Sequence, residues 1–129
     1  MTQSPIQEMP SLPPSMVPQP RPGEFVAVNF ISCNDAYRDR FEQLFRSRAH
    51  AIDPLPGFRH MVVLRPEREG GDYLVVSFWE NRASFDTWRA SPAFHAGHRR
   101  SFEDIRQARE RGEHPPMTSH METYEILTD

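Results

Sequence analysis

The spacing of apolar residues changes several times along the chain, and each change predicts a new element of secondary structure. Residues 24–32, EFVAVNFIS, are almost continuously apolar and rich in β-branched and aromatic side chains, as in a strand buried on both faces. Residues 32–52, SCNDAYRDRFEQLFRSRAHAI, begin with Ser32 or Asn34 as helix caps and then show helical spacing. This spacing predicts an amphipathic helix whose apolar face carries Tyr37, Phe41, Leu44, Phe45 and Ile52.

Two further strands are predicted after this helix. The segments 58–66, FRHMVVLRP, and 68–80, REGGDYLVVSFWE, carry apolar runs that are separated by a glycine-containing stretch. Proline and glycine in DPLPGF, just before the first run, end the preceding helix. The pattern therefore indicates a hairpin of two antiparallel strands.

The last third of the chain predicts two helical segments and a final strand. Asn81 can cap a short helix that runs through Phe85 and Trp88. Ser91 and Pro92 supply an N-cap and a first-turn proline, so a second segment starts there and fades near Gly112. The closing stretch SHMETYEIL is expected to form the last strand.

The resulting order, β-α-β-β-α-β, is typical of a ferredoxin-like α+β sandwich with both helices on one face of an antiparallel sheet. Alternate residues of 25–31 and 73–79 point to opposite faces, and both faces are largely apolar. Two helices can cover one face of such a sheet. We therefore expect the second face to pack on another copy of the chain, giving a sheet-to-sheet homodimer.

Composition separates a short tail from this domain. Seven of the 13 prolines lie in residues 1–23, which predicts an extended or disordered tail followed by one domain over 24–129. The tail has neither the basic start nor the apolar run of a secretory signal, and no window is long enough to cross a bilayer. We expect a cytoplasmic protein that does not contact a membrane.

Net charge and cysteine content indicate which partners and which kinds of site are not expected. A net charge of −3 offers no broad basic surface, so nucleic acid is not an expected partner. The arginines of RSFEDIRQARERGEH alternate with acidic residues and are interpreted as charge pairs on a solvated helix face. Cys33 is the single cysteine, so an intrachain disulfide or a thiolate metal cluster is not expected, and a buried or half-buried spectator role is.

Two polar residues interrupt otherwise apolar patterns. Phe94, His98, Phe102 and Ile105 share one face of the last predicted helix, which puts His98 on its core side. Asn29 lies in the most apolar strand, where an amide without partners costs about 1–3 kcal/mol. Both have an ordinary structural interpretation, as a hydrogen-bonded core histidine and as an amide at a bulge or bonded to neighbouring main chain. A binding site that uses both is the alternative.

Four segments carry a family resemblance: FVAVNF, RFEQLFRSRAHAIDPLPGF, YLVVSFWENRASFDTW and SPAFHAGHR. From about Glu24 to Leu127 the chain resembles the IsdG-type haem-degrading monooxygenases, within the antibiotic biosynthesis monooxygenase superfamily of dimeric α+β barrels. The W-E…F…W and S-P…F…H patterns also occur in superfamily members that bind no haem. The more specific signal is the catalytic Asn, Trp and His of that family, which by resemblance fall on Asn29, Trp88 and His98.

The resemblance implies a role for each of these side chains. His98 follows Phe94 by one helical turn, as the haem-iron ligand does in the family, although the HAGH of some relatives aligns the ligand with His95. A neutral imidazole can bind haem iron on the proximal side. Asn29 would donate a hydrogen bond on the oxygen side, and the ring of Trp88 would distort the macrocycle. From the residues alone, the favoured interpretation of Trp88 is a core aromatic three residues after Phe85.

Two residues of the first helix complete the expected site. Phe45 is expected to line the pocket, and Arg48 to bind a propionate or face the oxygen side. Core packing and a surface ion pair are their respective alternatives. Phe94 and His95 are the further candidates for contact with the cofactor. A zinc site on His95 and His98 is poorly supported, because the sequence places no carboxylate to complete it.

By resemblance, the expected function is that of a haem-degrading monooxygenase. Haem would be both substrate and cofactor, and O₂ with electrons from a reductase or a small reductant would open the tetrapyrrole and release iron. One alternative is a cofactor-free oxygenase of a polycyclic phenol, in which His98 acts as a base. The other is a haem-binding or storage protein without turnover.

Overall fold

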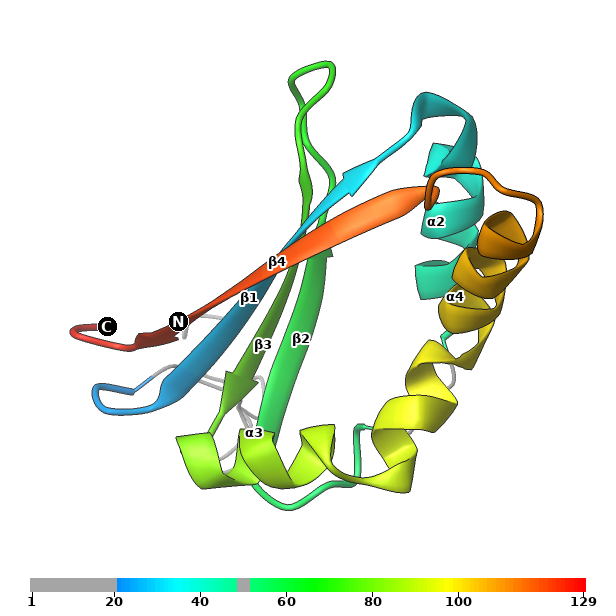
Figure 1. Cartoon of the computed structure of the whole chain (residues 1–129). Coiled ribbons are helices and arrows are strands. Elements are labelled where there is room, and N and C mark those ends of the chain that lie inside the picture. The colour runs from blue at the N-terminus through cyan, green and yellow to red at the C-terminus, as the bar shows by residue number, and fades with distance from the viewer. Residues whose placement is uncertain (1–20, 49–51) are drawn as a thin grey trace, which may run out of the picture.

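The computed structural model describes residues 21–48 and 52–129, so the first 20 residues of the expected tail lie outside the described part. Four strands form one antiparallel sheet with the order β2-β3-β1-β4 (Figure 1). The strands are β1 (Phe25–Cys33), β2 (Phe58–Leu64), β3 (Tyr73–Trp79) and β4 (Met117–Glu125). The predicted ferredoxin-like α+β fold is confirmed.

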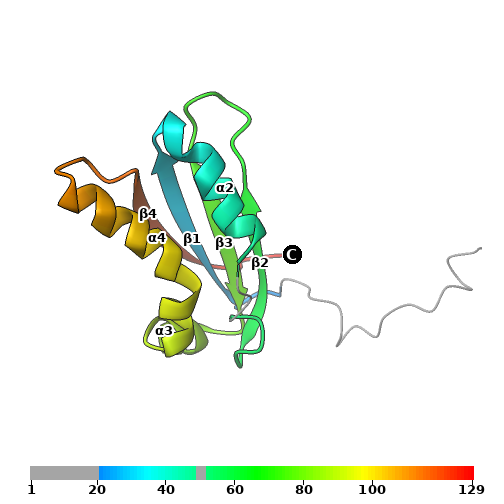
Figure 2. The same cartoon turned by 90° about the vertical axis from the view of Figure 1, so that its right-hand side faces the viewer.

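The helices all lie on the same face of this sheet, as Figure 1 and the turned view in Figure 2 show. The short 3-10 helix η2 (Asp35–Tyr37) leads into α2 (Arg38–Arg46), and α3 (Arg82–Arg89) is followed directly by α4 (Pro92–Glu110). Within the described ranges, no helix has both the length and the apolar character that crossing a bilayer requires.

The first helix is shorter than predicted. It ends at Arg46, with Ser47 as its C-cap, rather than continuing to Ile52. The Ser47 hydroxyl donates to the carbonyl of Gln43 at 2.7 Å, a local side-chain bond that competes with further helix. Ile52 is 7% exposed and still joins the core, but from a turn. Residues 49–51 lie outside the described part of the chain.

The predicted caps around α3 and α4 are confirmed in one case and corrected in the other. The Asn81 side chain accepts a hydrogen bond from the Ser84 amide at 2.9 Å, which caps α3. Ser91 occupies the N-cap position of α4, but its hydroxyl makes no cap bond and donates back to the Trp88 carbonyl at 2.6 Å. The Ser91 hydroxyl therefore links the N-cap residue of α4 to the last turn of α3 by a hydrogen bond.

The core lies between the helices and the inner face of the sheet. One cluster of buried side chains sits at the α3 end and a second at the α2 end; they contain Phe25, Ala27, Ile52, Trp79 and Phe85, and Ile31, Phe41 and Tyr73. Asn29 lies on β1 between Ala27 and Ile31, on the same inner face. The predicted alternation along β1 is thus confirmed, and it aims Asn29 at the helices.

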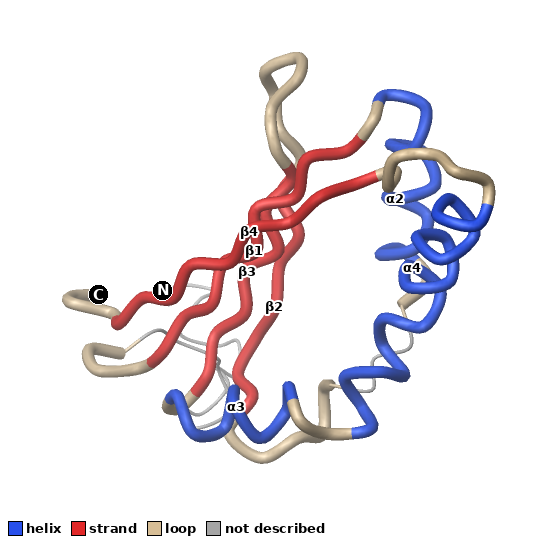
Figure 3. The backbone as a smooth tube through the Cα atoms, in the orientation of Figure 1, coloured by secondary structure: helices blue, strands red, loops and turns tan. Residues whose placement is uncertain are grey.

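The opposite face of the sheet carries no helix, which is plain in the tube view of Figure 3. Its centre is apolar, and Leu64 on this face is 46% exposed. We call it the helix-free face; its apolar residues are Val26, Val28, Phe30, Val62, Leu64, Leu74, Val76, Phe78 and Tyr124. The expectation that the helices leave one apolar face uncovered is confirmed.

Candidate functional site

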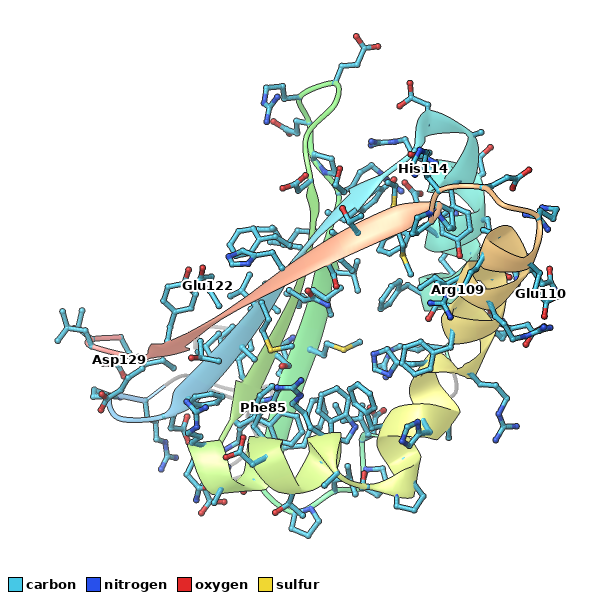
Figure 4. The ribbon with its side chains drawn as sticks, in the orientation of Figure 1. Phe85, Arg109, Glu110, His114, Glu122 and Asp129 are labelled. Atoms are coloured by element: carbon cyan, nitrogen blue, oxygen red, sulfur yellow. The ribbon has the colours of Figure 1, made fainter. Side chains whose placement is uncertain are left out.

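A cavity of about 200 Å³ opens between the inner face of the sheet and the helices α2, α3 and α4. Figure 4 shows the side chains that extend into the space between the sheet and α4. Five residues predicted for the site line this cavity: Asn29, Phe45, Arg48, Trp88 and His98. The remaining walls come from Ile31, Phe41, Leu44, Ile52, Met61, Val75, Ala93, Gly97, Arg100, Ser101, Phe102, Ile105, Met117, Thr118 and Ser119.

His98 lines this cavity, and one of its two ring nitrogens is already used in a hydrogen bond. Its Nδ1 lies 2.7 Å from the Phe94 carbonyl, so Nδ1 carries the hydrogen and Nε2 keeps its lone pair. The ring stacks on Phe94 and on Phe102, with centroid distances of 4.2 and 5.5 Å. Burial lowers the pKa of His98 below its ordinary value, against the opposing effect of the bond to Phe94. Burial therefore favours the neutral form of the imidazole.

His95 and Phe94 do not line the cavity. His95 is exposed, and its ring contacts the edge of Phe94 at a centroid distance of 5.8 Å. Phe94 lies behind His98 and supports its ring. Of the two candidate histidines, His98 is the one in the cavity wall.

The helix face that carries Phe102 was expected to pack in the core, and this expectation is wrong for Phe102. Its side chain is 44% exposed although it lines the cavity and stacks on His98. Ala108 is the buried residue of α4 within the described chain. Three residues of the α4 stripe, His98, Phe102 and Ile105, thus line the cavity. The backbone of α4 stands away from the sheet over this stretch (Figures 1 and 3).

Trp88 sits in a group of aromatic rings at the α3 end of the cavity. Its ring lies 5.5 Å from Trp79, 5.0 Å from Phe94 and 5.9 Å from His98, measured between centroids. Its indole Nε1 is buried and has no hydrogen-bond partner among the described residues. A buried donor without an acceptor costs about 1–3 kcal/mol, so this N–H is a candidate donor to a bound ligand.

We expect Trp88→Phe to lower the free energy of unfolding less than Trp79→Phe does. Trp79 is fully buried, and its Nε1 donates to Ser77 Oγ at 2.9 Å, so the change removes a buried hydrogen bond and leaves a void. Trp88→Phe removes a donor that has no partner. Urea unfolding of both variants would measure the difference, expected at about 1–2 kcal/mol. Equal losses would mean that the Trp88 N–H is bonded in solution.

Asn29 lies in an unbroken part of β1. It pairs with Val75 on β3 and Met121 on β4, and the register on both sides is continuous. Its side chain is half-buried and makes no hydrogen bond to the described residues. Neither a bulge nor a bond to main chain therefore explains the amide, which faces the cavity.

Positive charge borders the cavity at the end of α2. Arg48 pairs with Asp53, with 3.3 Å between Nη1 and Oδ1, so the ion-pair interpretation and the cavity position both hold. Phe45 packs on Phe41 with a centroid distance of 4.9 Å and also lines the cavity. Arg100 on α4 is a second cavity arginine, which the sequence interpretation assigned to a solvated charge run.

Cys33 is outside this site. Its thiol is half-buried, and burial raises its pKa to about 11, so it stays protonated at neutral pH. Among the described residues, histidine, cysteine and carboxylate side chains form no group of three or more that could hold a metal ion. The spectator role predicted for Cys33 is consistent with this position.

Comparison with known proteins assigns the family. The model of the antibiotic biosynthesis monooxygenase family matches residues 24–100. The chain belongs to the antibiotic biosynthesis monooxygenase family. This family member is 38% identical over 76 residues to the mycobilin-producing haem oxygenase of Mycobacterium tuberculosis, a match that covers 57% of this chain and 72% of the relative.

Two solved structures illustrate the range of chemistry among similar folds. MhuD of Mycobacterium tuberculosis, a haem degrader with two haems bound in its active site, is 30% identical with a TM-score of 0.61; the match covers 81% of this chain and 97% of MhuD. SnoaB of Streptomyces nogalater, a cofactor-independent oxygenase, is 20% identical with a TM-score of 0.59; the match covers 83% of this chain and 96% of SnoaB. The second likeness shows the fold alone.

Proposed function

We propose that this monooxygenase-family protein degrades haem, which it binds as both substrate and cofactor, and that O₂ and external electrons open the tetrapyrrole and release iron. One observation carries the proposal. His98 lies in an apolar cavity wall with Nδ1 bonded to the Phe94 carbonyl, and its burial favours the neutral imidazole, whose Nε2 lone pair can bind iron. The similarity to a haem oxygenase and to MhuD supports the same substrate.

The kinds of side chain around the cavity suit haem. Apolar and aromatic walls match the macrocycle, and Arg48 suits the carboxylate of a propionate. The cavity of about 200 Å³ is smaller than the ~300–1,000 Å³ of ordinary ligand sites. A macrocycle would therefore leave one edge in solvent or move α4, which has little buried surface to hold it.

Each residue of the site then has a distinct task. Bound haem supplies the iron at which O₂ is activated and the carbon that is oxidised. His98 holds the iron from α4, and Asn29 donates a hydrogen bond from the sheet, with an uncharged amide that adds no competing ligand. Trp88 places a large ring and a free N–H against the ligand. Phe45 closes the α2 side, while Phe94 stacks on His98 from outside the cavity lining.

The electron donor is an external reductase or a small reductant, and a cytoplasmic location agrees with such a donor. Neither nucleic acid nor a membrane has a part in this proposal. The iron and the opened tetrapyrrole are the products.

A two-step titration tests the proposed function. Adding haem to the purified protein should produce a Soret band of a histidine-ligated complex, and ascorbate under air should then remove that band as the macrocycle opens. A cofactor-free oxygenase would give no Soret band. A storage protein would give the band and keep it after ascorbate is added.

We further propose that the protein is a homodimer that buries the helix-free face. Val76 lies at the centre of this face, between Val28 on β1 and Val62 on β2. Val76→Lys would bury a charge at the interface, so we expect it to convert the dimer to a monomer in light scattering coupled to size exclusion. Thr87→Lys, on an exposed position of α3, is the matched control and should stay dimeric. A dimeric Val76→Lys would assign the contact to another surface.

A further inference from the structure

Arg100 joins the two helical walls of the cavity. It lies on α4, two residues after His98, and also lines the cavity itself. Its Nη2 donates to the carbonyls of Leu44 and Ser47 at 2.9 and 3.0 Å, and its Nη1 donates to Ser47 Oγ at 3.0 Å. An arginine of one helix thus caps the end of another helix, 53 to 56 residues away in the sequence.

This contact meets a specific need at the end of α2. The last four carbonyls of a helix have no partner within it, and a cation near them also interacts favourably with the helix dipole. At this end, the Gln43 carbonyl accepts from Ser47, and the Phe45 carbonyl accepts from the Arg48 amide at 3.3 Å. The Leu44 carbonyl is left for Arg100. The planar guanidinium can reach three acceptors at once, which an ammonium cannot do in the same geometry.

Polar contacts also hold α4 to the α2 region, since little of α4 is fully buried. Ala108 is its buried residue within the described chain, and Phe102 is 44% exposed. A second contact lies one turn after Arg100, where Asp104 accepts hydrogen bonds from Tyr37 at 2.7 Å and from Arg40 at 3.0 Å. Asp104 does not line the cavity, whereas Arg100 does.

We propose that Arg100 is a positioning residue of the ligand site: by capping α2 from α4, it fixes the wall that carries His98 relative to the wall that carries Phe45 and Arg48. The identity of the ligand rests on the proposed function, but the effect on the two walls does not. Removing Arg100 lets the first turns of α4 move away from α2. The ligand then has to restore the spacing of the walls, and its affinity falls.

Three variants separate this role from general support of the fold. Arg100→Gln removes both the positive charge and the planar guanidinium with its several donors. Arg100→Lys keeps the charge but replaces the guanidinium by a compact ammonium group. Asp104→Asn weakens the second contact between α4 and the α2 region. Hydrogen exchange of the ligand-free proteins would report on residues 92–102 and on the end of α2. We expect Arg100→Gln to lose protection at both places and Asp104→Asn to keep it there.

Haem titrations followed at the Soret band give the second measurement. We expect the dissociation constant to rise about tenfold in Arg100→Gln, as for the loss of charge-assisted hydrogen bonds, and less in Arg100→Lys. Asp104→Asn should stay within about twofold of the wild type. At saturating haem, all three should show the ferric spectrum of the wild type, since His98 is unchanged.

Other outcomes would overturn the inference. If Arg100→Gln and Asp104→Asn lose exchange protection and haem affinity to the same extent, Arg100 supports the fold in general and has no special role at the site. If Arg100→Gln binds haem with the affinity of the wild type, Arg100 does not position the site. Should Arg100→Gln fail to fold, the comparison of Arg100→Lys with Asp104→Asn decides in the same way. A wild-type protein that binds no haem contradicts the proposed function instead, and the exchange experiment still tests the contact between the walls.

Discussion

His98→Ala should abolish axial ligation of haem iron and with it the degradation of haem, while His95→Ala should preserve both. The two histidines are three residues apart on α4, yet their surroundings differ. His98 lies in the cavity wall between Phe94 and Phe102, and its Nδ1 is bonded to a main-chain carbonyl. His95 is exposed and is not among the residues that line the cavity. Absorption and resonance Raman spectra of the ferric complexes would identify the axial ligand in each variant.

His95→Ala is the matched control, because it removes the same side chain from the same helix without changing the cavity. We expect its haem affinity and its turnover with ascorbate to stay within about twofold of the wild type. In His98→Ala, added imidazole should restore part of the ligation, since the cavity that remains is bounded by Phe94 and Phe102. Loss of ligation in His95→Ala with retention in His98→Ala would move the ligand to His95. Unchanged spectra in both variants would contradict the assignment of a histidine ligand.

The fold and part of the site could be predicted because they depend on local periodicity. Alternation along β1 is enough to place Asn29 on the same side as Ala27 and Ile31. A period of 3.6 is enough to put His98 on one stripe with Phe94 and Phe102. What the stripe faces is a tertiary property, so its interpretation as core was wrong for Phe102, which is 44% exposed.

Residues that reach the cavity from distant segments could not be predicted in this way. Arg100 looks like part of a solvated charge run, since its acceptors on Leu44 and Ser47 are more than 50 residues away in the sequence. Ser119 enters the cavity through its pairing with Ile31 across β1 and β4, a register that depends on the whole sheet. The end of α2 at Arg46 also escaped prediction, because helical spacing continues to Ile52 although the helix does not.

Asn29→Ala should leave haem bound and slow its degradation by about 10²–10³-fold, the usual effect of losing one preorganised donor in an active site. The amide lies in an unbroken strand and has no bond to the described residues, so it is free to donate into the cavity. The rate of Soret loss with ascorbate under air measures the effect, and a haem titration measures the affinity. The ferric spectrum should keep its histidine ligand, because His98 belongs to α4 and is unaffected.

Two further variants, Asn29→Asp and Ser119→Ala, test whether the slow degradation is due to loss of the Asn29 donor. Aspartate keeps the size of asparagine but, when ionised, has no hydrogen to donate, so Asn29→Asp should be as slow as Asn29→Ala. Ser119→Ala removes a polar group from the same cavity on the neighbouring strand, and we expect its rate to stay within about threefold of the wild type. A fast Asn29→Asp would mean that the volume of the side chain matters rather than its donor. If Asn29→Ala instead binds haem more weakly but degrades bound haem at the wild-type rate, the amide holds the ligand in place and takes no part in the oxygen chemistry.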